Sequence, residues 1–138
     1  MSRHVAREVA FKIVFEMAFN DETSEELYSK FLECNEKNFE DVNDEDKKYI
    51  QEVINGIKEN ISAIDDMIKS KLKDWNFERI SKIDLSVLRL AIYELLYRED
   101  IPVKVAVNEA VEICKVFGEE TSPNFVNGVL AQVIREKK

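Results

Sequence analysis

The chain has 138 residues, of which 45% are hydrophobic and 35% are charged, and its formal net charge is −8. This composition is typical of a globular protein that can bury a core, and it argues against a disordered chain. No apolar run approaches the roughly 20 residues that a membrane helix needs, and Glu8 and Glu16 interrupt the apolar start, so we expect neither a membrane span nor a secretory signal. Cys34 and Cys114 form no CxxC motif, which predicts two reduced thiols in a cytoplasmic protein.

The negative charge is concentrated in one segment. Residues 21–52 contain twelve acidic and four basic residues, which accounts for the whole net charge of −8. Negative net charge argues against nucleic-acid binding, but the neutral remainder of the chain leaves a local basic patch possible.

The first segment predicts a helix that runs to about residue 20, because its apolar residues recur with the 3.6-residue period. Arg3 and Arg7 are four residues apart and share one face, while His4 and Lys12 lie in the neighbouring row. These cations predict either a solvated helix face or part of a nucleic-acid-binding patch. A capping box at residues 23–26 predicts a second helix, and the polar residues 34–42 predict a loop.

The middle of the chain predicts three further helices. Acidic residues at 44–46 suit a helix N-terminus, and apolar stripes follow at residues 49–57 and 61–72, separated by a break near Asn60. Eleven of the fifteen residues from 83 to 97 are apolar or aromatic, which predicts the central helix of the fold. Arg89 and Glu94 lie inside this helix, where each is expected to form a tie to another helix or to face a partner.

Pro102 marks the start of the next helix, which ends at Phe117 with Gly118 in the position of a C′ glycine. Within it, Asn108 and Glu109 predict either a capping role or a contact with a partner.

The stretch SPNFVNGVL, residues 122–130, carries two conflicting signals. Asn-Gly between apolar residues is typical of a hairpin turn, but the apolar positions follow helical spacing through Ile134. We therefore predict a helix that opens with Ser122 as N-cap and Pro123 as its first residue. Glycine is costly inside a helix, so Gly128 predicts close packing against another helix, with Asn127 directed away from that contact.

Together these elements predict one all-α domain over residues 1–138, a compact bundle of about seven helices. The only histidine is His4, and no glycine-rich phosphate loop or activated nucleophile is recognisable. We therefore expect no enzymatic activity, no metal and no cofactor.

Four stretches together resemble the NusB family of bacterial transcription antitermination factors. They are RHVAREVAFKIVFEM (3–17), IDLSVLRLAIYELLYREDIP (83–102), KVAVNEAVEICKVFG (104–118) and SPNFVNGVL. The resemblance implies a non-enzymatic helical protein that binds boxA RNA and pairs with NusE, a protein of the small ribosomal subunit. It further implies action in an RNA polymerase antitermination complex, notably in ribosomal RNA operons, and leaves open whether the free protein is a monomer or a homodimer.

The resemblance also implies an RNA surface formed by the N-terminal segment and by residues 122–128. The positions that match are Arg3, His4, Arg7, Asn124, Phe125 and Asn127, and Lys12 joins them because it continues the row of His4. Phe125 is open to two interpretations, a core residue or a base-stacking one. The resemblance places the partner surface around Asp84. This chain has fewer N-terminal arginines than many family members, so its own RNA affinity is expected to be modest and to depend on the partner.

Two alternatives use the same fold. One is the RNA-binding domain that precedes the catalytic domain of certain ribosomal RNA cytosine methyltransferases. The length of 138 residues argues against it, because we expect no room for a cofactor-binding domain. The other is a protein-only interaction scaffold, which the thinned arginine segment keeps open.

Overall fold

The computed structural model describes residues 3–18, 43–72 and 76–137. Within these residues it contains six α-helices, one short 3-10 helix and no strand, which confirms the all-α prediction. The elements are α1 (Arg3–Met17), α4 (Asp44–Glu59), α5 (Ile61–Ser70), η1 (Phe77–Arg79), α6 (Lys82–Tyr97), α7 (Val103–Phe117) and α8 (Ser122–Lys137). The predicted helix after residue 23 and the predicted loop at 34–42 lie outside the described residues.

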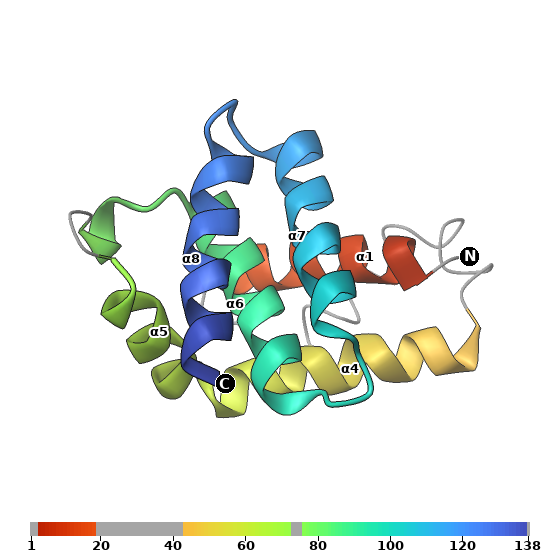
Figure 1. Ribbon diagram of the computed structural model, residues 1–138. Helices are drawn as coiled ribbons and strands as arrows, with labels where there is room; N and C mark the ends of the chain where they lie inside the picture. The colour runs from red at the N-terminus through yellow and green to blue at the C-terminus, as the bar shows by residue number, and fades with distance from the viewer. Residues whose placement is uncertain (1–2, 19–42, 73–75, 138) are drawn as a thin grey trace.

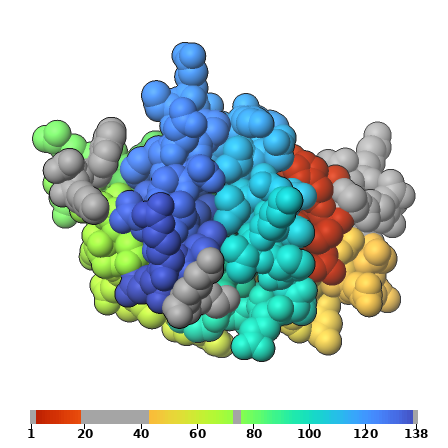
Figure 2. Space-filling view, viewed as in Figure 1, coloured from red at the N-terminus to blue at the C-terminus, as the bar shows by residue number. Residues whose placement is uncertain are grey.

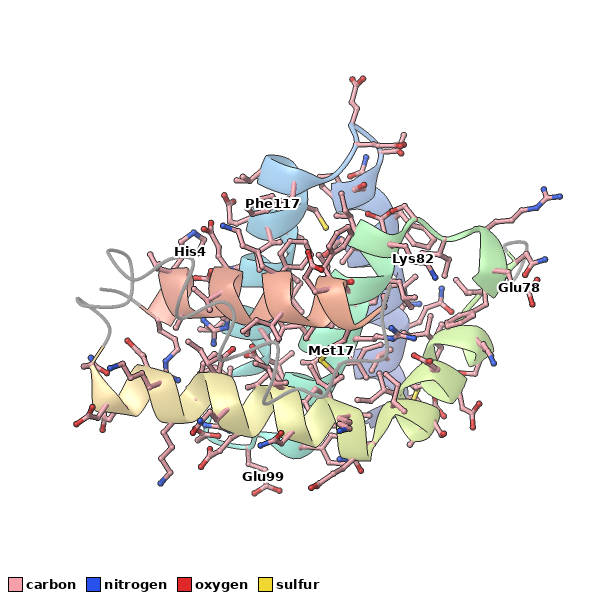
Figure 3. All side chains as sticks on the ribbon, turned by 180° about the vertical axis from the view of Figure 1, so that it is seen from behind. His4, Met17, Glu78, Lys82, Glu99 and Phe117 are labelled. Atoms are coloured by element: carbon pink, nitrogen blue, oxygen red, sulfur yellow. The ribbon has the colours of Figure 1, made fainter. Side chains whose placement is uncertain are left out.

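Helix α6 is the centre of the fold, as its apolar composition predicts. It contacts α1, α4, α5, α7 and α8, and every residue from Leu85 to Leu95 except Arg89 is buried. Figure 1 shows α7 and α8 upright beside α6, with α1 and α4 running across behind them. Seen from the opposite side in Figure 3, α1 and α4 form the near layer. The helices therefore cross in two layers, and their apolar faces meet in one core around α6.

The described helices begin at or next to the predicted residues. The Asn43 side chain accepts a hydrogen bond from the Asp46 backbone N–H at 2.8 Å, which caps α4. Asn60 ends α4 and precedes α5, as the predicted break requires, and Pro102 precedes α7. Helix α8 confirms that SPNFVNGVL is helical, although Ser122 already belongs to the helix.

Two glycines allow close contacts within the fold. A Cβ at Gly56 would overlap the Tyr93 ring, so α4 and α6 can approach closely only because the side chain is absent. Gly118 ends α7 as predicted, but with an extended backbone (φ −92°, ψ −172°) in place of the left-handed conformation that a C′ glycine would adopt. A Cβ there would lie 2.7 Å from Ser122 Oγ, so close approach explains this glycine.

The packing prediction for Gly128 is wrong. A Cβ at this position would meet no atom within 4 Å, and the residue is exposed on α8. None of the helices in the described ranges is long and apolar enough to cross a membrane.

Candidate nucleic-acid interface

Helix α1 carries four of the predicted RNA-binding residues, but its packing separates them. It contacts α4, α6 and α7, and seven of its fifteen residues are buried. Ala6 and Ala10 are fully buried, and their small side chains let these neighbours approach closely. A residue on α1 is therefore exposed only if its side chain points away from α4, α6 and α7.

Arg7 is buried, with 4% of its surface exposed. Its Nε donates to Glu94 Oε1 at 3.0 Å, and its Nη2 donates to Glu94 Oε2 at 3.1 Å. Tyr49 completes the group by donating its hydroxyl to Glu94 Oε1 at 2.6 Å. Burial, together with the Glu94 carboxylate, raises the pKa of Tyr49, so the phenol stays protonated. The prediction that Arg7 shares an exposed RNA-facing surface with Arg3 is therefore wrong, because its guanidinium neutralises a buried carboxylate.

The same network confirms the predicted role of Glu94 as a tie between helices, since it joins α6 to α1 and α4. Arg89 forms the second tie, a bidentate pair with Asp65 of α5 at 2.9 and 2.8 Å.

Arg3 lies at the edge of this network. Its Nε donates to Asp46 Oδ1 at 2.9 Å, and its guanidinium carbon lies 4.6 Å from the centre of the Tyr49 ring. Because 37% of its side chain is exposed, Arg3 presents part of its guanidinium to solvent.

His4 is held between two carboxylates. Its Nε2 lies 3.2 Å from Glu8 Oε1, and its Nδ1 contacts Glu109 Oε2 of α7. The hydrogen bond with Glu109 raises the pKa of His4, against the opposing effect of burial. Figure 3 shows His4 at the N-terminal end of α1. Glu109 thus serves neither as a helix cap nor as a free surface acid, because its carboxylate ties α7 to α1.

Lys12 is the exposed cation of the set. Its Nζ lies 5.5 Å from the centre of the Phe117 ring, a cation–π contact, and no carboxylate of the described ranges lies within ion-pair distance. Figure 3 shows Phe117 at the end of α7, beside α1. Since α8 begins five residues after Phe117, the structure places Lys12 close to the corner from which α8 starts.

Helix α8 exposes the predicted amides. Asn124 and Asn127 are exposed, whereas Phe125 is partly buried and packs against the core. The turn before α8 is ordered by Ser122, whose hydroxyl accepts a hydrogen bond from the Glu119 backbone N–H at 3.0 Å. Figure 2 shows α8 running along the front surface of the molecule, next to α7.

Asp84, the predicted partner residue, lies in the first turn of α6. Its backbone N–H donates to Ser81 Oγ at 3.1 Å, which caps the helix. Its Oδ1 is buried and accepts no hydrogen bond from the described residues. Burial and the nearby Asp84 carboxylate raise the pKa of Cys114 to about 12.

The structure therefore divides the predicted RNA residues into two groups. Lys12, Asn124 and Asn127 are exposed near the start of α8 or on it, whereas Arg3, His4 and Arg7 lie at the other end of α1 and meet carboxylates. Asp46 and Tyr49 were predicted as a helix N-terminal acid and a member of an apolar stripe, and nothing in their spacing identifies them as partners of these cations. No group of three potential metal ligands occurs in the part of the chain that the structure describes.

Comparison with known proteins supports the resemblance. The model of the NusB family matches residues 4–135. The transcription antitermination protein NusB of Clostridium novyi (strain NT) is 46% identical over 135 residues, which cover 98% of this chain and 99% of that protein.

The chain belongs to the NusB family.

Solved structures place this NusB-family chain among the same proteins. The structure of T. maritima NusB matches it with a TM-score of 0.88 and 40% identity, over 99% of this chain and 92% of that one. A chain in the crystal structure of antitermination factors NusB and NusE in complex with dsRNA matches with a TM-score of 0.85 and 25% identity, over 99% of both chains.

Proposed function

We propose that this chain is a transcription antitermination factor that binds boxA RNA together with NusE and suppresses termination in ribosomal RNA operons. The observation that carries the proposal is the match, over 99% of both chains, to a chain of the complex of NusB and NusE with dsRNA. On this proposal it acts in the cytoplasm as a single non-enzymatic domain within an RNA polymerase antitermination complex.

The proposed RNA surface runs from Lys12 to the N-terminal half of α8. Lys12 would meet a phosphate, because it is exposed and no described carboxylate neutralises it. Asn124 and Asn127 would bond base edges, since a side-chain amide can both donate and accept. Arg3 and His4 would extend the surface along α1. Phe125 would anchor this part of α8 to the core, against which it packs.

The proposed partner surface is centred on Asp84. Asp84 is partly exposed in the first turn of α6, where its negative charge would attract a cationic group of NusE. A second protein bound there would extend the RNA surface, which suits a chain in which Arg3, His4 and Arg7 already contact carboxylates.

The test measures the Kd of a boxA RNA oligonucleotide over a series of salt concentrations, with and without NusE. Lys12→Ala should reduce the slope of log K against log salt by about 1, because one phosphate contact is lost. Asn127→Ala should weaken binding about tenfold with the slope unchanged, since an amide–base contact contributes about 1–3 kcal/mol. Lys58→Ala removes an exposed lysine from α4 and should change neither quantity.

Asp84→Asn tests the partner surface separately. It should lower the affinity for NusE while leaving the salt dependence of RNA binding by the free protein unchanged.

One observation favours the protein-only scaffold as a second candidate. Arg3, His4 and Arg7 all meet carboxylates within the chain, which lowers the positive charge available to phosphates. A scaffold would bind NusE but would show no salt-dependent RNA binding in any of these measurements, and that result would replace the first proposal.

A further inference from the structure

Both ring nitrogens of His4 are occupied by carboxylates of the chain itself. When the ring is protonated, each nitrogen carries a hydrogen and can donate it. Nε2 lies 3.2 Å from Glu8 Oε1, and Nδ1 contacts Glu109 Oε2. The ring is still accessible to a ligand, because 40% of the His4 side chain is exposed. An RNA phosphate can therefore bind His4 only if one of the two carboxylates gives way.

The two carboxylates are not equivalent. Glu8 lies one turn after His4 on the same helix, and an exposed pair of this kind stabilises a helix only slightly. Glu109 belongs to α7, so its contact with His4 joins two helices. The Glu109 hydrogen bond is also the main cause that raises the pKa of His4, whereas the charges of Glu8 and Glu112 contribute less. The Glu8 contact is therefore the one that a phosphate can replace while His4 stays charged.

The acids on the other helices packed against this end of α1 are engaged by arginines. Asp46 of α4 accepts a hydrogen bond from Arg3, and Glu94 of α6 accepts hydrogen bonds from Arg7. The charge on His4 therefore depends mainly on carboxylates of α1 and α7.

Glu8 also stands between two cations of the proposed RNA surface. His4, Glu8 and Lys12 recur every four residues, so they form one row along α1. With a rise of about 1.5 Å per residue, Glu8 is roughly 6 Å along the helix from each of the two cations. A phosphate backbone that follows this row must pass Glu8, whose negative charge repels it. The position of Glu8 therefore limits how well one RNA strand can contact both cations.

We propose that Glu8 is an internal competitor of RNA: its carboxylate occupies His4 Nε2 and turns away when a phosphate binds there, while Glu109 keeps its hold on Nδ1. This inference rests on the proposed RNA-binding function and adds a residue that regulates it. Glu109 is a positioning residue, because it acts on RNA only through the orientation and charge of the His4 ring. The chain thus binds RNA more weakly than its cations alone would allow, and removal of the Glu8 carboxylate should strengthen binding.

The first test measures the Kd of a boxA RNA oligonucleotide at about pH 6, where an unperturbed histidine is mostly charged. Glu8→Ala should bind about three- to fivefold more tightly than the wild type, which is the upper end of what an exposed ion pair contributes. Glu112→Ala is the matched control, because it removes the same charge from an exposed residue whose carboxylate pairs with Lys115 at 3.3 Å. This control should change the affinity less than twofold. In a His4→Gln background, the gain from Glu8→Ala should shrink to that of the control.

The second test follows the RNA affinity from about pH 6 to about pH 9. The charged ring binds phosphate, so the wild-type affinity should fall as the pH rises through the raised pKa of His4, and His4→Gln should remove this fall. Glu109→Gln should move the fall to lower pH, because the anion that raises the pKa of His4 is lost. A purely structural role of Glu109 would weaken binding equally at every pH and would contradict the positioning role.

The remaining outcomes separate this inference from the proposed function. Equal gains in Glu8→Ala and Glu112→Ala would overturn the inference, because a change in net charge would then explain both. Unchanged or weaker binding by Glu8→Ala would also overturn it, and the proposed function would stand if Lys12→Ala still reduces the salt dependence. If the wild-type protein binds no RNA with or without NusE, the proposed function is wrong and this inference with it.

Discussion

The buried group of Arg7, Glu94 and Tyr49 makes a strong prediction about stability. Arg7→Met removes the cation but keeps a long apolar side chain, so Glu94 stays buried with 1% of its surface exposed and only the Tyr49 hydroxyl as partner. Breaking a buried ion pair by removing one member costs about 3–5 kcal/mol. This is a large part of the 5–15 kcal/mol that is roughly typical of a domain, and it corresponds to a fall in Tm of roughly 10–20 °C.

The assay is urea unfolding followed by far-UV circular dichroism for four proteins. These are the wild type, Arg7→Met, Glu94→Met and the double variant. The double variant should be more stable than either single variant, because it leaves no unpaired buried charge. Asp100→Asn breaks the pair between Arg98 and Asp100 on the surface, where 62% of the Asp100 side chain is exposed, and should cost at most about 1 kcal/mol.

Two results would refute this reasoning. The first is a loss of less than about 1 kcal/mol for Arg7→Met, which would mean that Glu94 is not held as a buried anion. The second concerns RNA. Folded Arg7→Met, measured well below its Tm, should keep the wild-type slope of log K against log salt, because Arg7 contacts a carboxylate in the interior. A reduced slope would place its guanidinium on a phosphate.

Three further predictions concern separate positions. Gly56→Ala should destabilise the protein by about 1–3 kcal/mol, because the new Cβ meets the Tyr93 ring; an unchanged Tm would show that the ring moves aside freely. The Glu109 hydrogen bond raises the pKa of His4 above 6.5, so this tie stabilises the fold fully below about pH 6.5 and weakens as pH rises through the raised pKa. The difference in urea midpoint between wild type and His4→Gln should therefore shrink from about pH 6 to about pH 9, and a constant difference would contradict the tie. Burial raises the pKa of Cys114 to about 12, so in a Cys34→Ser background Ellman's reagent should react at about pH 8 only after unfolding, and a fast stoichiometric reaction of the native protein would be inconsistent with this burial.

The helices were predictable because each depends on a local pattern. The apolar residues of α6 surround the whole helix, and this alone identifies the central element. In α8 the helical spacing of the apolar residues was a better guide than the Asn-Gly turn signal. Burial of a continuous apolar stripe stabilises the helix by more than a single glycine destabilises it. The helix ends also depend on local contacts. The Asn43 and Ser81 side chains cap α4 and α6 through hydrogen bonds to the backbone three residues later.

The site was less predictable because its contacts are distant in sequence. Arg7 and Glu94 are separated by 87 residues, and nothing in the spacing of α1 shows that its Arg7 face meets α6. The sequence did indicate that Glu94 needs a partner, because an acid in an apolar helix is costly alone. It could not indicate which of the twenty lysines and arginines supplies the charge. The packing prediction for Gly128 was wrong for a related reason. A glycine inside a helix does not show by its sequence position whether another helix lies against it.

The pairing of the α1 cations has a consequence for how the chain would bind RNA. A cation that already contacts a carboxylate must lose that contact, or share it, before it neutralises a phosphate, so it releases less counterion on binding. Arg3, His4 and Arg7 are in this position, and Lys12 is the cation of the predicted set that no described carboxylate neutralises. Arg3, His4 and Arg7 should therefore add little to the salt dependence of RNA binding by this chain alone, whereas Lys12 should contribute the slope of one phosphate contact. A steeper dependence in the presence of NusE would then measure the charge that the partner brings to the RNA.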